Sequence, residues 1–162
     1  MALTQIQGSG ISNVTISADG EVTKAAQPAF MAGPSGTQSN MANDTTIVLG
    51  TEVFDVGANF ASNTFTAPVT GKYQLNASIR LQSVDSASNY IYLVIDTSNR
   101  DYYSVIDPDF GQDAGYWNLS VSVMADMDAS DTAIMKFGYD GGAQQVDTSA
   151  SGGTLFSGAL IC

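Results

Sequence analysis

Aspartates crowd two short segments of this 162-residue chain, and they are the side chains best suited to chemistry. The first group is Asp126, Asp128 and Asp131, and the second is Asp107, Asp109 and Asp113. Paired carboxyl groups hydrolyse glycosidic bonds when a cleft holds them at a set separation, and oxygen-rich loops bind calcium. Asp is also common in turns, where its side chain accepts hydrogen bonds from nearby backbone N–H groups. We expect turn chemistry here, with the first group as weak calcium candidates and no other cofactor.

Composition excludes most other catalytic chemistry. The chain has no histidine, so Ser-His-Asp and Cys-His arrangements and histidine-based zinc sites are ruled out. Cys162 is the single cysteine, so no intrachain disulfide forms. There is no Gly-x-x-x-x-Gly-Lys loop for phosphates. The sequence therefore predicts a protein that is not an enzyme.

Aromatic residues supply the best candidates for ligand contact. The segment "SNRDYYSVIDPDFGQDAGYW", residues 98 to 117, sets tyrosine, phenylalanine and tryptophan among four aspartates. Rings beside acidic and amide groups can stack on sugars or anchor a protein partner. We expect Tyr102, Tyr103 and Phe110 to make such contacts, and Trp117 to fill the core.

The charge balance limits the partners. With 5 Lys and Arg against 16 Asp and Glu, the formal net charge is −11, which disfavours nucleic acid and anionic membranes. No apolar run approaches the roughly 20 residues that cross a bilayer. The start "MALTQIQGSG" lacks the basic and apolar regions of a secretion signal. We expect the protein to be made in the cytosol and to bind neither nucleic acid nor membrane.

The elements that position these residues are predicted to be strands. From residue 73 to 81, Tyr, Leu, Ala, Ile and Leu alternate with polar residues, the period of a half-buried antiparallel strand. "NYIYLVIDT", residues 89 to 97, is typical of a central strand. Turn signals separate about ten such strands, and no segment has a helical apolar period. The fold class is therefore all-β, an antiparallel sandwich or jelly roll.

Residues 1–26 are predicted to be a separate arm, and residues 27–162 a head domain. Asp19-Gly20 is a favoured hairpin turn within the arm. The arm's apolar residues are too few to build a core, so we expect them to dock on another surface. They are Ile6, Ile11, Val14, Ile16 and Val22.

Four segments of the head occur in the order found in one known superfamily. They are "AF" at 29–30, "VFDVGANFASNTFTAPVTGKYQLNASI" at 53–79, "MDASDTAIMKF" at 127–137 and "LFSGALI" at 155–161. Together they resemble the globular head of the complement recognition protein, within the tumour necrosis factor-like superfamily. The resemblance implies a ten-stranded jelly roll and a homotrimer. The chain departs from the family pattern in lacking its cysteines, its collagen-like stalk and its secretory context.

The leader before "QPAF" is similar to that of bacteriophage structural proteins with such heads. We therefore expect a trimeric virion protein, either a capsid decoration protein or a short head fibre, that docks through its arm. The trimer interface is expected on a polar, nearly uncharged strand face that includes Gln74, Asn76, Ser78, Tyr116 and Asn118. The alternative is a receptor- or glycan-binding head of a phage tail fibre.

Overall fold

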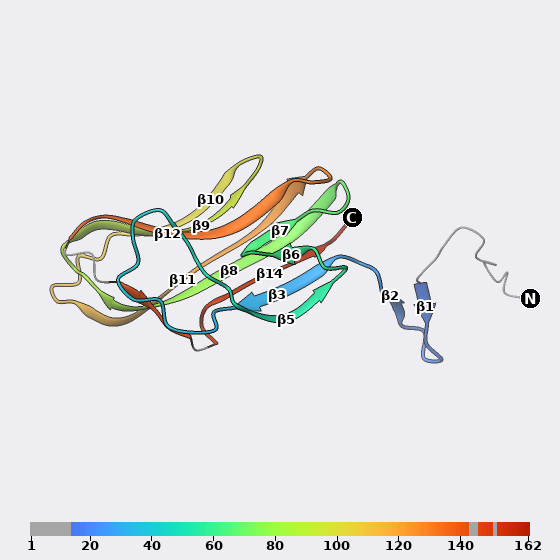
Figure 1. The fold of residues 1–162 in the computed structure, drawn as a ribbon, viewed down its shortest axis with the longest axis horizontal. Helices are drawn as coiled ribbons and strands as arrows, with labels where there is room; N and C mark the ends of the chain where they lie inside the picture. The colour runs from blue at the N-terminus through green and yellow to red at the C-terminus, as the bar shows by residue number, and fades with distance from the viewer. Residues whose placement is uncertain (1–13, 143–145, 151) are drawn as a thin grey trace, which may run out of the picture.

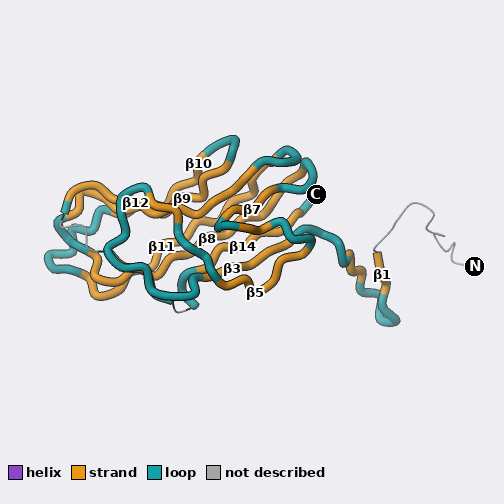
Figure 2. The backbone as a smooth tube through the Cα atoms, in the orientation of Figure 1, coloured by secondary structure: helices purple, strands orange, loops and turns teal. Residues whose placement is uncertain are grey.

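The structure is a computed structural model that describes residues 14–142, 146–150 and 152–162. These residues form strands joined by turns and loops (Figures 1 and 2). None of them belongs to a helix that is long and apolar enough to cross a membrane. The predicted all-β class is confirmed.

Two antiparallel sheets build the head. The first, called the β8 sheet, has the order β11 (Ala114–Met127), β8 (Gly71–Val84), β14 (Leu155–Leu160), β3 (Ala29–Gly33) and β5 (Thr51–Val56), with β13 (Asp147–Thr148) also paired to β8. The second, called the β9 sheet, has the order β10 (Asp101–Ile106), β9 (Ser88–Thr97), β12 (Thr132–Gly141), β7 (Thr64–Thr66) and β6 (Phe60–Ala61), with β4 (Thr45–Thr46) also paired to β12. Ten strands lie along these two paths and the short β4 and β13 pair beside them, so the predicted antiparallel sandwich is confirmed.

The alternation from residue 73 to 81 decides which face of β8 is buried. Its apolar residues are all at most 2% exposed, and they are Tyr73, Leu75, Ala77, Ile79 and Leu81. The Tyr73 hydroxyl donates a hydrogen bond to the Val69 carbonyl at 2.7 Å, so the ring is buried without an unsatisfied polar atom. This strand behaves as the sequence predicts.

Aromatic rings fill the space between the sheets near β3. Phe30 stacks on Phe60 and Phe65 with ring centroids 5.0 and 4.6 Å apart, and Phe156 meets Phe30 edge-on at 5.0 Å. These rings come from both sheets and bury large apolar areas, which stabilises the sandwich. The predicted central strand, β9, lies between β10 and β12 and contributes Ile91, Leu93 and Ile95 to the same core.

Trp117 corrects one prediction. Its ring was expected in the core, but the side chain is 37% exposed and stacks on Phe110 with centroids 4.8 Å apart. Leu119 and Val121, further along β11, are buried as predicted. The alternation along β11 therefore predicts correctly which side chains point toward the core. Near the start of the strand, however, these side chains are only partly buried.

The arm carries a separate two-stranded hairpin, β1 (Val14–Ile16) and β2 (Val22–Lys24). Gly20 in its turn has φ of 91°, a conformation that glycine adopts readily, and so the predicted hairpin is confirmed. Every residue from 14 to 26 is exposed, and the hairpin stands clear of the head (Figure 1). Ile6 and Ile11 lie outside the described residues.

Candidate functional site

The outward face of the β8 sheet is uncharged over its centre. Gln74, Asn76 and Ser78 point outward from β8, because the residues between them point into the core. Register pairs them with side chains on both neighbouring strands. We call this set the amide face, and it comprises Gln74, Asn76, Ser78, Asn118, Ser120, Ser122 and Ser157.

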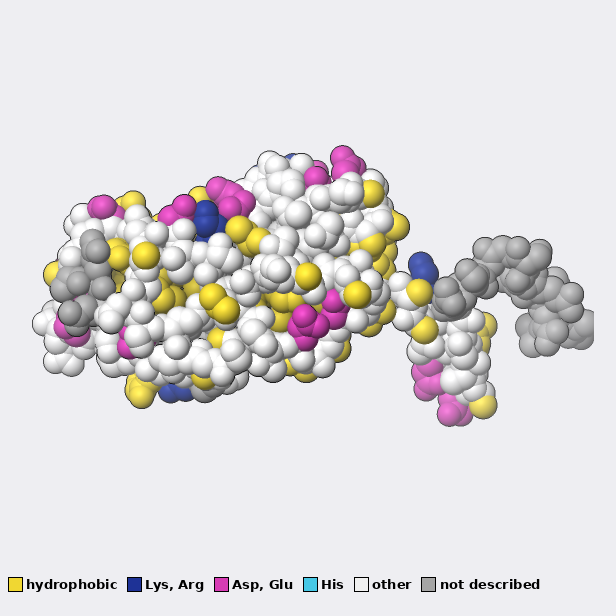
Figure 3. All heavy atoms as spheres, viewed as in Figure 1, with side chains coloured by type: hydrophobic (Ala, Val, Ile, Leu, Met, Phe, Trp, Pro, Cys, Tyr) yellow, Lys and Arg dark blue, Asp and Glu magenta, His cyan; other side chains and the backbone are white. Residues whose placement is uncertain are grey.

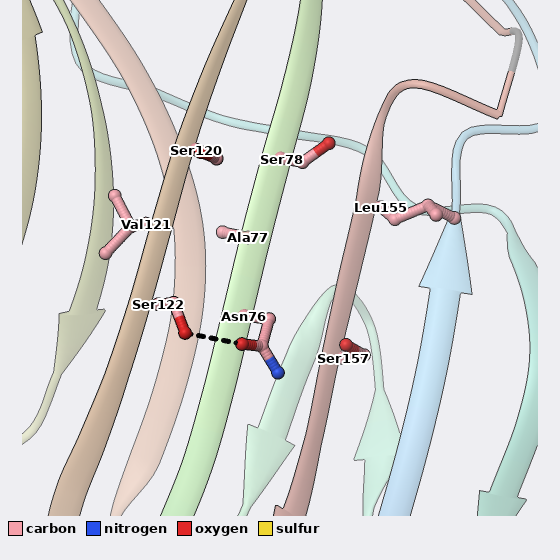
Figure 4. A pocket seen from close by; sticks show the side chains of 8 residues that line it. All are labelled: Asn76, Ala77, Ser78, Ser120, Val121, Ser122, Leu155 and Ser157. Carbon is pink, nitrogen blue, oxygen red and sulfur yellow. Dashed lines mark hydrogen bonds between the residues drawn. The ribbon is translucent and has the colours of Figure 1, made fainter.

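Hydrogen bonds among these side chains order the amide face. Ser122 Oγ donates to Asn76 Oδ1 at 2.8 Å (Figure 4), and Gln74 Nε2 donates to Ser122 Oγ at 3.1 Å. The side chains around Asn76 line a shallow hollow of about 250 Å³ between β11, β8 and β14. The face thus presents side chains that are already hydrogen-bonded to one another, and it carries both donors and acceptors.

Apolar side chains continue this face toward β5. A second hollow of about 260 Å³ is lined by Met31, Phe54, Ala159 and Ile161 beside Gln74. Phe54 and Ile161 are exposed. The sequence analysis did not select these four residues. The alternation along β3 and β14 could have indicated two of them, because Met31 and Ala159 point to the outer face while Phe30 and Phe156 of the same strands point into the core.

Charges border the amide face. Lys72 and Asp126 lie opposite each other in register at one end. At the other end the Arg80 guanidinium carbon lies 4.5 Å from the centre of the Tyr116 ring. The five predicted interface residues therefore share one face, with Tyr116 at its margin and 62% exposed.

The first aspartate group serves a turn and an ion pair. Asp131 accepts hydrogen bonds from the Asp128 backbone N–H and from Asn99 Nδ2, both at 2.8 Å. Asp126 pairs with Arg100 at 3.2 Å. Across residues 14–142, 146–150 and 152–162, no three His, Cys, Asp or Glu side chains form a group that could hold a metal ion. Asp126, Asp128 and Asp131 thus do not converge as calcium ligands.

The second aspartate group also bonds within loops. Asp113 accepts from the backbone N–H of Ser86 at 3.0 Å and from its hydroxyl at 2.9 Å. These two bonds favour the ionised carboxylate and lower the pKa of Asp113. Asp107 accepts from the backbone N–H of Asp109 at 3.3 Å. This bonding is the turn chemistry expected from the sequence.

The structure does not bring the three predicted ligand-contact residues together. Tyr102 faces inward and packs against the core, whereas Tyr103 faces outward from the same strand and is 55% exposed. Phe110 lies in the loop after β10 and stacks on Trp117. Neighbouring residues of a strand point to opposite faces, so Tyr102 and Tyr103 cannot share one ligand surface.

Tyr103 instead joins two tyrosines that the sequence analysis missed. Tyr90, Tyr92, Tyr103 and Val105 line a hollow of about 430 Å³ on the outer face of the β9 sheet, which we call the tyrosine groove. The signal was present in the segment at 89–97, since Tyr90 and Tyr92 alternate there with the buried Ile91 and Leu93. That segment was interpreted only as a central strand.

Charged groups flank the tyrosine groove. Lys136 Nζ lies 2.7 Å from Asp44 and 3.6 Å from Asp96, and the hydrogen bond to Asp44 raises the pKa of Lys136. Burial raises the pKa of Asp96, and the nearby Asp101 carboxylate raises it further. Tyr103 donates its hydroxyl to Asp101 at 2.9 Å, which raises the pKa of Tyr103.

Comparison with known proteins shows the fold. Zebrafish complement 1qA globular domain superposes with a TM-score of 0.60 at 15% identity, over 84% of this chain and 98% of that one. Murine APRIL superposes with a TM-score of 0.61 at 12% identity, over 83% and 99% of the two chains. No family model and no curated protein sequence matches this chain. The head thus has the same jelly-roll fold as these two structures.

Proposed function

We propose that this protein is a non-enzymatic structural component of a bacteriophage virion. In this proposal three copies associate through their amide faces, and the arm attaches the trimer to the capsid as a decoration protein or short head fibre. The observation that carries the proposal is the amide face, an ordered and uncharged surface on a chain of net charge −11. A surface meant only for solvent usually carries more Lys and Glu.

The composition of this surface suits a subunit contact. Charged residues are depleted at the centre of protein interfaces, while amides, hydroxyls and trapped water supply the hydrogen bonds. The apolar side chains of Met31, Phe54 and Ile161 at the margin add buried area. Three-fold packing also covers edges of the β8 sheet, which otherwise leave backbone groups open to other strands.

The arm supports attachment to a second protein. Val14, Ile16 and Val22 lie on one face of the hairpin, because Ile16 pairs with Val22 and Val14 with Lys24. All three are exposed, and hydrophobic side chains are visible on the surface of the arm (Figure 3). A lone two-stranded hairpin is at best marginally stable in water, so a partner that covers this apolar face would stabilise it. We place that partner in the virion shell, with Ile6 and Ile11 of the arm as further contacts.

Two measurements on the full chain test this proposal. Native mass spectrometry should give three times the 16.9 kDa of one chain. A variant lacking residues 1–26 should still have three times the mass of its own shortened chain, but it should fail to bind particles stripped of this protein. A stable monomer would contradict the amide-face assembly. A truncated trimer that still binds particles would contradict attachment through the arm.

The alternative function is a receptor- or glycan-binding head at the tip of a tail fibre. The exposed rings of the tyrosine groove favour it. A trimer built through the amide faces leaves these rings free, because the two surfaces belong to opposite sheets of the sandwich.

A further inference from the structure

The tyrosine groove is built from three neighbouring strands in register. On the outer face of the β9 sheet, Tyr92, Val94 and Asp96 of β9 each lie between one residue of β10 and one of β12. The resulting rows are Asp101–Asp96–Ile134, Tyr103–Val94–Lys136 and Val105–Tyr92–Gly138, and Tyr90 lies opposite Asp140. The rings of Tyr90, Tyr92 and Tyr103 follow one another, with centroid separations of 6.3 and 5.5 Å.

Gly138 sets the position of the central ring. A Cβ atom at this residue would lie 2.2 Å from the end of the Tyr92 ring, so the ring rests on the bare backbone of β12. Any larger residue would push the ring outward and fill the groove. Glycine weakens a strand interior and often marks a close approach, and here the approaching group is Tyr92.

Hydrogen bonds and packing fix the remaining groups. Asp44 forms an ion pair with Lys136 at 2.7 Å, and the Tyr103 hydroxyl donates a hydrogen bond to Asp101 at 2.9 Å. Val94 lies on the outer face between Tyr103 and Lys136 yet is only 2% exposed. The side chains around Val94 therefore pack closely over it and form the floor of the groove. A ligand would meet tyrosine rings that are already held in place by these contacts.

The chemistry of the groove selects the class of ligand. Exposed ring faces and Val105 offer apolar contact, while phenol hydroxyls, carboxylates and one ammonium offer donors and acceptors close by. Carboxylates outnumber the Lys136 ammonium in these rows and beside them. They belong to Asp44, Asp96, Asp101 and Asp140. The resulting negative field repels anions. A fitting ligand therefore has apolar faces, many hydroxyl groups and no negative charge.

We propose that the tyrosine groove binds a neutral oligosaccharide, with sugar rings stacked on Tyr90, Tyr92 and Tyr103 and sugar hydroxyls bonded to Asp101 and Lys136. This site deepens the alternative function and does not rest on the virion assignment. Pockets for small ligands combine aromatic walls with a few polar groups that fix orientation, and this groove has both. Because it lies on the sheet opposite the amide face, each copy in a trimer presents one site.

The direct test measures binding of neutral glucose, mannose and galactose hexasaccharides to the full-length protein by saturation-transfer NMR and calorimetry. A galacturonic acid hexasaccharide serves as the charged probe. We expect at least one neutral probe to bind and the charged probe to bind more weakly. If no neutral probe binds, or if the acidic one binds best, the proposal is overturned.

Variants locate the site. Tyr103→Ala and Tyr90→Ala should each weaken binding at least about fivefold, since a lost ring contact is worth about 1 kcal/mol. Gly138→Ala should weaken it while removing no side chain. Phe110→Ala, which removes an exposed ring outside the groove, should leave binding unchanged. Loss of binding in Phe110→Ala but not in Tyr103→Ala would overturn the assignment.

One further outcome separates sugar binding from a protein contact in the groove. Chemical iodination of Tyr103 should proceed equally in the dissociated chain and in the native oligomer, and the sugar should protect it. Protection by oligomer formation alone would make the groove a subunit interface and overturn the proposal. Failure of the trimer or of particle attachment would leave these binding results unaffected, so the two proposals fail separately.

Discussion

Gly158 shows how tightly single residues are constrained in this core. A Cβ atom there would lie 2.6 Å from a Leu75 methyl group and 2.8 Å from the Phe30 ring. Both neighbours are fully buried and have no room to move. We expect Gly158→Ala to lower the free energy of unfolding by about 1–3 kcal/mol through overpacking.

Urea unfolding at matched protein concentration measures this effect, because the proposed oligomer would make the apparent stability concentration-dependent. Gly36→Ala is the matched control, since the added methyl group meets no atom within 4 Å and the residue has no positive φ. If the two variants were equally stable, the close approach of β14 to Leu75 and Phe30 would be contradicted.

Asp96 links the tyrosine groove to pH. Burial and Asp101 raise its pKa above the usual 3.8, although Lys136 acts in the opposite direction and Asp44 shares that lysine. The folded chain therefore holds this proton more tightly than the unfolded chain. The stabilising contribution of Asp96 is complete below pH 3.8 and is lost as pH rises through the folded-state pKa.

Asp96→Asn removes this dependence. The free energy of unfolding of the variant, minus that of the wild type, should increase between pH 3.5 and neutrality, because only the wild type loses the stabilising contribution of Asp96. Thermal unfolding across that range measures the difference. A difference that stays constant, or that falls with rising pH, would contradict a raised pKa. Asp101→Asn, which keeps Asp96, should lower the Asp96 pKa in a carbon-detected NMR titration.

Individual strands could be predicted to different degrees from the sequence. The strict alternation at 73–81 sufficed to orient β8, because a one-residue shift would bury every polar side chain. The same rule applies to β10, where alternation places Tyr102 and Tyr103 on opposite faces, but proximity in sequence suggested a shared site. Trp117 has the correct parity, but it lies near the start of β11, where its ring stacks on Phe110 of the preceding loop and stays 37% exposed.

For the candidate surfaces, the sequence predicted which residues of one strand share a face, but not which strands lie side by side. The amide face follows from the polar phase of β8 and β11, so Gln74, Asn76 and Ser78 were identified. Phe54 and Ile161 join that face only through the pairing order β8, β14, β3 and β5, which is a tertiary property. The tyrosine groove likewise requires β10, β9 and β12 to be neighbours. A single sequence carries no direct signal for such pairings.

A charge placed on the amide face tests its role at the level of the sheet. We expect Asn76→Lys to raise the dissociation constant of the proposed trimer at least about tenfold, because a charge that is buried and unpaired in the interface costs several kcal/mol. Sedimentation velocity measures the change in association. The secondary structure seen by circular dichroism should stay the same, since Asn76 is exposed in the single chain.

Thr66→Lys is the matched control for this substitution. Thr66 is also an exposed strand residue, but it belongs to β7 in the opposite sheet. The added lysine there should leave association unchanged. Equal dissociation in both variants would mean that added charge acts at any surface position, and an intact oligomer in Asn76→Lys would exclude the amide face as the interface.

At the level of the whole molecule, the sandwich separates three surfaces. The amide face lies on one sheet, the tyrosine groove lies on the other, and the hairpin of the arm extends from one end (Figure 1). Most of the surface in view is uncharged, with carboxylates in scattered groups (Figure 3). The proposed attachment, assembly and sugar binding would thus use three separate surfaces.

The net charge of −11 leads to a prediction about how salt affects association of the subunits. Subunits of like charge repel one another over the Debye length, which falls from about 30 Å at 0.01 M salt to about 8 Å at 0.15 M. Among the residues that the structure describes, no ion pair involves a side chain of the amide face, so salt has none to weaken there. Salt should therefore strengthen association, and we expect the trimer dissociation constant to decrease as salt rises over this range.

Analytical ultracentrifugation at both salt concentrations measures this constant. Lys72→Gln makes the net charge more negative, so the variant should show a steeper dependence on salt. A trimer that salt weakens would have to be held by ion pairs, which would contradict assembly through an uncharged face.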